Sequence, residues 1–198
     1  TGLPVYEPQG SFVVDIGGGT TEVALVSMGG VVLSHSVRVA GNKIDEAIAG
    51  FLKKQHAILV TDRVAEQIKF DLADVRSEKK MEHIAVVRGR DIATGMPLTV
   101  EVNMAKVSEA IREPIQEILG AIKWVLGRVP PELCADILQN GSYLTGGSAA
   151  LPNLDTMIAT EFGVPVSVAR DAGECTTLGA GYMADHFDML GGISGKAE

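Results

Sequence analysis

Residues 13–27 carry the sequence VVDIGGGTTEVALVS, in which two apolar runs flank three consecutive glycines. The run before the glycines and the alternating residues after them predict two strands, because buried strands read as short apolar runs and half-buried strands alternate. The glycines at 17–19 resist both helix and strand, so they predict a tight turn. A third strand is expected at 31–39 after a second glycine turn, which completes an antiparallel meander.

The rest of the chain alternates helices and strands. Pro114 lies inside an apolar helical run at 107–126, where it should kink the helix or mark a junction between two helices. The charged stretch 74–82 is predicted to be a solvated loop, and the last ten residues are expected to fray. Other helices are expected from Asn42 (as N-cap) and at 62–73, 131–138, 154–162 and 177–188, and other strands at 83–88, 98–102, 143–145 and 164–168. This order predicts an α/β fold with a mixed sheet flanked by helices.

Composition excludes several classes of function. The 198 residues are 46% hydrophobic and 21% charged with a formal net charge of −8, which is typical of a globular protein. A nucleic-acid-binding domain would normally show a basic face, and no apolar run approaches the ~18 residues of a membrane span. The polar, proline-broken start does not resemble a signal peptide. Because there is no initiator Met and the first strand begins almost at once, we expect a piece of a longer protein.

The two cysteines and the single tryptophan indicate ordinary packing rather than chemistry. Cys134 and Cys175 have neither the spacing of a zinc site nor that of a disulfide framework. We predict two buried thiols in a reducing compartment. Trp124 is predicted to be a core residue of the long helix.

Asp15 and the glycine turn after it form the first candidate binding site. Glycines let backbone N–H groups converge on a phosphate oxygen without interference from Cβ atoms. The hydroxyls of Thr20 and Thr21 would add donors, and Asp15 at the strand end could hold a hydrated Mg²⁺. A plain hairpin turn explains the same residues equally well.

Gly146 and Gly147, followed by Ser148, form the second candidate site. A backbone without side chains between a strand and a helix permits close approach by a phosphate or a flat ligand. The alternative is a strand-to-helix turn that needs a positive φ angle. Neither glycine turn matches the Walker A pattern or the dinucleotide fingerprint.

Two further features lie between these turns. Gly41 leads into a helix whose N-terminus carries a partial positive charge, although a simple helix start accounts for it as well. Glu66 and Lys69 lie one helical turn apart, and the plain alternative is a surface ion pair.

Taken in order, four segments resemble the actin-like ATPase superfamily: VVDIGGGTTEVALVS (13–27), AGNKIDEAI (40–48), RVAEQIKFDLA (63–73) and YLTGGSAALPNL (143–154). The first resembles its second phosphate loop and the last its adenosine motif. Within the superfamily, residues 10–188 are most similar to the C-terminal half of an MreB-type bacterial actin, and a magnetosome-type actin is the near alternative. The family's usual third glycine of the adenosine motif is Ser148 here, which predicts a slightly narrower pocket.

The resemblance implies a fold and a site. Residues 10–56 and 103–188 would form a ribonuclease-H-like subdomain with a mixed five-stranded sheet, residues 57–102 a small α+β insert, and residues 1–9 and 189–198 flexible ends. The implied cofactors are ATP or ADP with Mg²⁺. The implied contacts are Asp15 for the Mg²⁺ water shell; Gly17, Gly18, Gly19, Thr20 and Thr21 for phosphates; Gly41 and Asp45 for phosphate and sugar; Glu66 and Lys69 for ribose or adenine; and Gly146, Gly147 and Ser148 for adenosine.

The resemblance also implies a function: a cytoplasmic, filament-forming actin involved in cell shape or intracellular organisation. This chain would supply one wall of the nucleotide cleft. The first half of the family's fold carries the other phosphate loop and the membrane-binding segment, so we expect ATP hydrolysis only together with that half and no direct membrane contact from this one. The implied partners are further copies of the chain, the N-terminal half and a RodZ-type adaptor.

Two other functions remain open at this point. The chain could be a standalone, non-catalytic interaction module derived from an actin half. A chaperone-type or sugar-kinase ATPase of the same superfamily fits less well, because the insert is short and no sugar-binding constellation is visible.

Overall fold

The computed structural model describes residues 1–75 and 84–186. Its larger sheet has five strands in the order β3-β2-β1-β7-β8. Strands β1, β2 and β3 pair antiparallel, whereas β1 pairs with β7, and β7 with β8, in parallel. The predicted mixed sheet is therefore confirmed. The strands are β1 (Ser11–Ile16), β2 (Thr21–Ser27), β3 (Gly30–Val37), β7 (Ser142–Thr145) and β8 (Val166–Val168).

The central strand β1 is held by its alternating side chains. Phe12, Val14 and Ile16 are buried in the core, while Val13 and Asp15 are only partly covered. This alternation is the period of two expected for a strand, and it directs Asp15 away from the apolar core. The meander predicted around residues 13–27 is present with β1 and β2 in register from Ser11 to Ile16.

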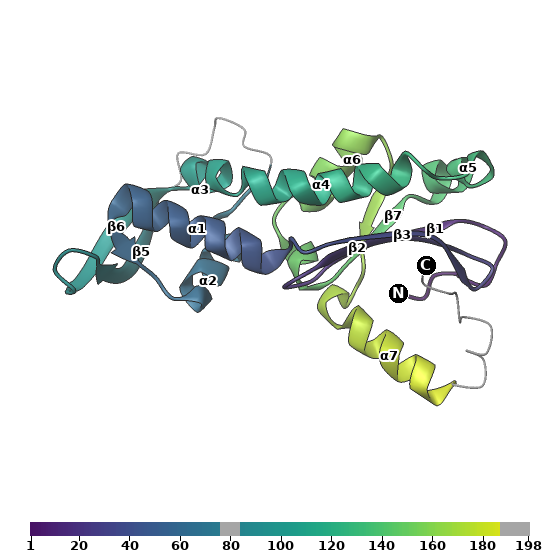
Figure 1. Cartoon of the computed structure of the whole chain (residues 1–198), viewed down its shortest axis with the longest axis horizontal. Coiled ribbons are helices and arrows are strands. Elements are labelled where there is room, and N and C mark those ends of the chain that lie inside the picture. Colours follow the sequence, from purple (N-terminus) through teal and green to yellow (C-terminus); the bar gives the residue numbers. More distant parts are fainter. Residues whose placement is uncertain (76–83, 187–198) are drawn as a thin grey trace.

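Helices cover the sheet unequally (Figure 1). Helices α4 (Arg112–Leu126), α5 (Pro131–Asn140) and α6 (Leu154–Phe162) lie on one side of the sheet, and α7 (Cys175–Asp185) lies on the other. Helix α4 carries a buried stripe with helical spacing, which includes Ile115, Ile118, Ile122 and Val125. No residue of α7 is buried. One face of the sheet is thus packed and the other is largely open.

A second sheet of three antiparallel strands, in the order β4-β5-β6, lies at the far end of α1 (Gly41–His56) from the larger sheet (Figure 1). Helix α2 (Asp62–Leu72) packs against α1, and α3 (Met104–Ala110) contacts both α1 and β6. The strands are β4 (Ile58–Leu59), β5 (Ile84–Asp91) and β6 (Pro97–Asn103). Among the described residues, none of the helices combines the length and apolar character needed to cross a bilayer.

The long helical run predicted at 107–126 is divided in two. Helix α3 ends at Ala110, and α4 begins at Arg112. Pro114 lies in the first turn of α4, where a missing backbone N–H is tolerated, so the junction alternative is the correct one.

The predicted N-cap at Asn42 is wrong. Helix α1 begins at Gly41, and its N-cap residue Ala40 makes no side-chain cap. The backbone N–H groups of Gly41 and Asn42 instead donate to the carbonyl oxygens of Gly17 and Gly18, at 3.1 and 2.8 Å. Tertiary contact with the first glycine turn therefore satisfies the helix start in place of a side chain.

Three predictions of burial also need correction. Cys134 is exposed and Cys175 is only partly buried. Trp124 is 37% exposed, because its ring stacks on His35 (centroids 4.4 Å apart) and under Arg128 (4.0 Å) at the surface of α4. Asp74, placed at the start of a solvated loop, is buried: its backbone N–H donates to Ser108 Oγ at 3.2 Å.

Some expectations lie outside the described residues. They are the remainder of the charged loop from residue 76 onward, His83 of the strand expected at 83–88, the end of the helix expected at 177–188, and the last ten residues.

Gly89 tests how closely β4 and β5 pack. A Cβ at this position would lie 2.3 Å from the carbonyl oxygen of Leu59 and 2.8 Å from Cγ1 of Ile58. We expect Gly89→Ala to lower the free energy of unfolding by about 1–3 kcal/mol, the usual cost of overpacking, in urea denaturation.

The matched control is Gly50→Ala. Gly50 lies inside α1 with open space around it, so alanine should raise stability by about 0.5–1 kcal/mol. A Gly89→Ala variant as stable as the unsubstituted chain would show that the two strands do not meet in this way.

Candidate functional site

The two predicted glycine turns meet at one edge of the larger sheet. Strands β1 and β7 are parallel neighbours, with Asp15 opposite Thr145, and each is followed directly by glycine. The carboxyl ends of parallel strands are where open α/β sheets bind ligands. The turn after β1 and the turn after β7 thus form one continuous edge.

The first turn is tied to the fold on one side and open on the other. The Gly17 N–H donates to the Thr20 carbonyl oxygen at 3.0 Å, while Gly18, Gly19 and Thr20 are exposed. Thr21 is fully buried, and its hydroxyl donates to the Val39 carbonyl oxygen at 2.7 Å. The hydroxyl expected from Thr21 at a phosphate is therefore committed to the core, and the outward-facing groups are those at 18–20.

Gly146 lets the two turns approach each other. Its φ angle is +86°, and a Cβ here would lie 2.3 Å from the carbonyl oxygen of Ile16 and 2.7 Å from Oδ1 of Asp15. Any side chain would collide with the end of β1, so this position requires glycine both for its φ angle and for space. The Gly146 N–H is used as well, because it donates to the Ala172 carbonyl oxygen at 2.7 Å.

Gly147 differs from Gly146, because no protein atom lies within 4 Å of a Cβ built there. Gly147 begins a short 3₁₀ helix, η1 (Gly147–Ala150), rather than an α-helix. It lines a hollow of about 400 Å³ together with Gly146, Ala150 and the segment 168–174. This wall without side chains can accept a flat or charged group at close range. The segment 168–174, with Arg170 at the hollow, was not among the predicted site residues.

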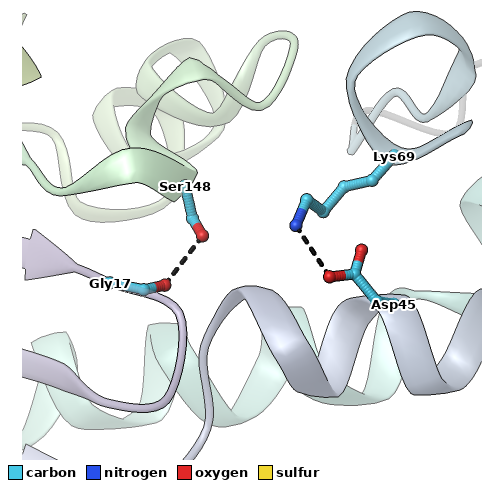
Figure 2. A network of polar contacts seen from close by, with 4 residues as sticks. All are labelled: Gly17, Asp45, Lys69 and Ser148. Atoms are coloured by element: carbon cyan, nitrogen blue, oxygen red, sulfur yellow. Dashed lines mark hydrogen bonds and ion pairs between the residues drawn. The ribbon is translucent and has the colours of Figure 1, made fainter. Parts of the chain in front are cut away.

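Ser148 joins the two turns instead of narrowing a pocket. Its side chain is 3% exposed, and its hydroxyl donates to the carbonyl oxygen of Gly17 at 2.9 Å (Figure 2). The prediction of a slightly narrower pocket is thus wrong, because the hydroxyl points to the first turn and is satisfied there.

Asp45 of α1 and Lys69 of α2 form a buried ion pair beside this contact (Figure 2). The Lys69 Nζ lies 3.0 Å from Asp45 Oδ2, and the side chains are 2% and 14% exposed. Glu66 is exposed, whereas Lys69 is buried and pairs with Asp45. The alternative of a surface ion pair between Glu66 and Lys69 is therefore wrong. The packing of α1 on α2 turns Lys69 inward, toward Asp45.

Within the described ranges, Oδ1 of Asp45 is buried and has no hydrogen-bond partner. Burial raises the pKa of Asp45 above its ordinary value, and the hydrogen bond and charge of Lys69 oppose that rise. A buried, unpaired carboxylate oxygen is costly in the absence of a ligand.

Gly41 sits between the two polar contacts. A Cβ at Gly41 would lie 2.6 Å from Ser148 Oγ and 3.2 Å from Lys69 Nζ. Predicted residues from all four resembling segments (13–27, 40–48, 63–73 and 143–154) are therefore brought together here. The amide of Gly41, however, donates to Gly17 and is not free for an anion.

Asp15 lies at the end of β1 with its carboxylate partly exposed. Its Oδ2 accepts a hydrogen bond from the Thr176 hydroxyl of α7 at 2.8 Å. Over the ranges that the structure describes, no group of three or more His, Cys, Asp or Glu side chains could hold a metal. The residues fit Mg²⁺ nonetheless, since this ion is commonly bound through one or two carboxylates, water and phosphate oxygens rather than a protein cage.

Two further contacts were not predicted from the sequence. Thr176 is separated from Asp15 by 161 positions, and no local pattern connects them. Asn153 has φ +62° at the start of α6, and its side-chain N–H donates to Asp74 Oδ2 at 2.8 Å. Asparagine tolerates this left-handed backbone conformation, so the residue type at position 153 was the one local indication of it in the sequence.

The Asp45–Lys69 pair yields a stability prediction. Lys69→Met keeps the length of the side chain but leaves the buried Asp45 carboxylate without a cation. We expect a loss of about 3 kcal/mol at pH 7 in urea unfolding. Because burial raises the folded-state pKa of Asp45 above its unfolded value, stability from this group is present at low pH and falls as pH rises through the folded pKa. The loss should shrink on acidification toward pH 4.

The double variant Asp45→Asn/Lys69→Met should recover part of the loss, since neither charge then remains buried alone. Lys106→Met, which breaks the exposed pair with Glu109 (3.0 Å), is the control and should change little. A Lys69→Met loss that does not depend on pH would contradict the assignment to Asp45.

Comparison with solved structures supports an actin-like fold. MreB5 of Spiroplasma citri, in a crystal structure bound to ADP, matches with a TM-score of 0.86 and 29% identity over 96% of this chain and 58% of that one. The same protein bound to AMPPNP matches equally well, with a TM-score of 0.86. The MamK double helical filament is a more distant neighbour, at a TM-score of 0.67 and 23% identity, which speaks to the fold alone.

Comparison with known sequences agrees. Mbl of Bacillus subtilis, a cell shape-determining protein, is 44% identical over 189 residues, which are 96% of this chain and 56% of that protein. The cell shape-determining protein MreB of Escherichia coli K12 is 44% identical over 191 residues, or 96% of this chain and 55% of that protein. The chain thus spans about half the length of these relatives. The family model of the MreB/Mbl protein matches residues 1–192, and the chain belongs to the MreB/Mbl family.

Proposed function

We propose that this chain supplies one wall of an ATP- or ADP-binding cleft in a filament-forming bacterial actin. The observation that carries the proposal is the meeting of the two glycine turns at the ends of β1 and β7, with Asp15 between them. The structures of Spiroplasma citri MreB5 with ADP and AMPPNP support nucleotide as the ligand.

In this proposal, different described residues contact different parts of the nucleotide. The exposed turn at Gly18–Thr20 receives phosphates, and Gly147 faces the nucleoside across the 400 Å³ hollow. Asp45 and Gly41 line the phosphate and sugar region, as the family resemblance implies. Asp15 holds Mg²⁺ through its water shell, and the ion would supply charge neutralisation at the phosphates.

The rest of the molecule takes the roles expected of the family. We propose that residues 57–102 form the inserted subdomain, that copies of the protein associate into filaments, and that a RodZ-type adaptor is a further partner. Hydrolysis depends on groups from both walls of the cleft, so turnover requires the N-terminal half.

The exposed apolar face of α7 supports the proposal that an N-terminal half forms the other wall of the cleft. Leu178, Tyr182 and Met183 are exposed by 58%, 53% and 46%, and no residue of the helix is buried. Leu178 and Tyr182 lie four positions apart, on one face of the helix. An exposed apolar helix face of this kind is suited to packing on another domain. The match covers 56% of the Mbl relative of Bacillus subtilis, whose remaining length leaves room for that domain.

Gly147→Val tests the nucleotide proposal directly. A Cβ here has open space within 4 Å, so we expect valine to leave the fold intact while it fills the ligand space. We expect calorimetry to show ADP binding in Mg²⁺ by the chain together with its N-terminal half, and a loss of at least about tenfold in affinity, or 1.4 kcal/mol, in the variant.

Gly120→Val, also in open space but on α4, is the matched control and should bind as the unsubstituted protein does. If the unsubstituted protein binds no nucleotide, the proposal fails and the standalone interaction module becomes the better account. Binding by the isolated chain tighter than about 100 μM, near −5.5 kcal/mol, would mean that this wall holds nucleotide without the other half.

A second experiment tests the α7 surface. Leu178→Glu should weaken association between this chain and a separately produced N-terminal half by more than about tenfold, because it places a charge in an apolar contact. Leu138→Glu on α5, where leucine is 62% exposed, is the control and should leave association unchanged. Equal affinities for both variants would exclude α7 from the contact.

A further inference from the structure

The carboxylate of Asp15 accepts a hydrogen bond at one oxygen and lies close to the second glycine turn with the other. Oδ2 accepts a hydrogen bond from Thr176 Oγ1 at 2.8 Å. Oδ1 faces Gly146 so closely that a Cβ there would lie 2.7 Å away. The carboxylate therefore has a defined orientation, although Asp15 lies at the end of an otherwise regular strand.

Thr176 reaches Asp15 because the second glycine turn places α7. The Gly146 N–H donates to the carbonyl oxygen of Ala172, which belongs to the short helix η2 (Ala172–Glu174) just before α7. Thr176 lies in the first turn of α7, at its second residue. The same glycine thus touches Asp15 directly and positions the helix that carries the hydroxyl.

A threonine hydroxyl has properties that suit this place. It donates one hydrogen bond without adding a positive charge, so the carboxylate keeps its negative charge for a cation. Branching at Cβ restricts the side chain to few rotamers, which narrows the positions of the hydroxyl. An ammonium group at the same distance would hold the carboxylate but would compete with Mg²⁺ for its charge.

We propose that Thr176 is a positioning residue for the metal-binding carboxylate of this site. Its hydroxyl occupies Oδ2 of Asp15 and fixes the carboxylate, so that the group is oriented before a hydrated Mg²⁺ and phosphate arrive. The inference rests on the proposed nucleotide function and deepens it. Thr176 acts through Asp15 and touches neither metal nor nucleotide.

The test separates this role from simple anchoring of α7. ADP affinity is measured by calorimetry on the full-length protein that the gene encodes, once with Mg²⁺ and once with EDTA. Thr176→Val keeps the shape of the side chain and removes the hydroxyl. We expect about five- to tenfold weaker binding with Mg²⁺, the effect of one lost hydrogen bond, and a change below about twofold with EDTA.

Two further variants sharpen the result. Thr176→Ser retains the hydroxyl and should restore most of the Mg²⁺-dependent affinity. Thr177→Val makes the same chemical change at the exposed neighbouring position and should bind as the unsubstituted protein does.

Several outcomes would overturn the inference. Unchanged Mg²⁺-dependent binding in Thr176→Val would show that the hydroxyl does not position the carboxylate. Equal losses with Mg²⁺ and with EDTA would show that Thr176 only anchors α7. Both of these results leave the nucleotide site standing, whereas an unsubstituted protein that binds no ADP would remove the proposed function itself.

Discussion

The carbonyl of Ile16 comes so near the Cα of Gly146 that no side chain fits between them. This approach joins the ends of β1 and β7, and the other features of the site follow from it. It lets the Ser148 hydroxyl reach Gly17, and it holds the segment before α7 through the bond from Gly146 to Ala172. A Cβ at Gly146 would push apart both turns and would also strike the Asp15 carboxylate.

Around this contact the protein builds the site mostly from backbone and places charge at its margins. The first two backbone N–H groups of α1 donate hydrogen bonds to the carbonyl oxygens of Gly17 and Gly18. These bonds attach the helix to the first turn, so the two N–H groups are not free to bind an anion. The charged groups are Asp15 on one side and the Asp45–Lys69 pair on the other. Burying that pair raises the pKa of Asp45 and, within the part of the chain that the structure describes, leaves one of its oxygens without a hydrogen bond, which is a cost in stability.

The distribution of buried surface fits a wall rather than a closed pocket. Helices α4, α5 and α6 pack one side of the sheet, whereas α7 stands on the other with its apolar residues exposed (Figure 1). The hollow beside Gly147 is lined from this chain on one side only, by the second turn and the segment 168–174. The match covers 56% of the Mbl relative, and under the function proposed above a further domain would cover α7 and close the cleft.

The sequence alone predicted the meander around residues 13–27, the mixed sheet, the two glycine turns and most of the element order, although not the short strand β4, because these features depend on local periodicity and on where only glycine fits. It also singled out Asp15, Asp45, Lys69 and Ser148. It did not determine their partners: Lys69 pairs with Asp45 rather than Glu66, Ser148 bonds Gly17, and the start of α1 is satisfied by a turn rather than by Asn42. Thr176 and the segment 168–174 were also not predicted as parts of the site. Hydrogen bonds between residues 24 to 161 positions apart leave no period in the chain, so the tertiary structure alone establishes which polar groups meet and which remain open to a ligand.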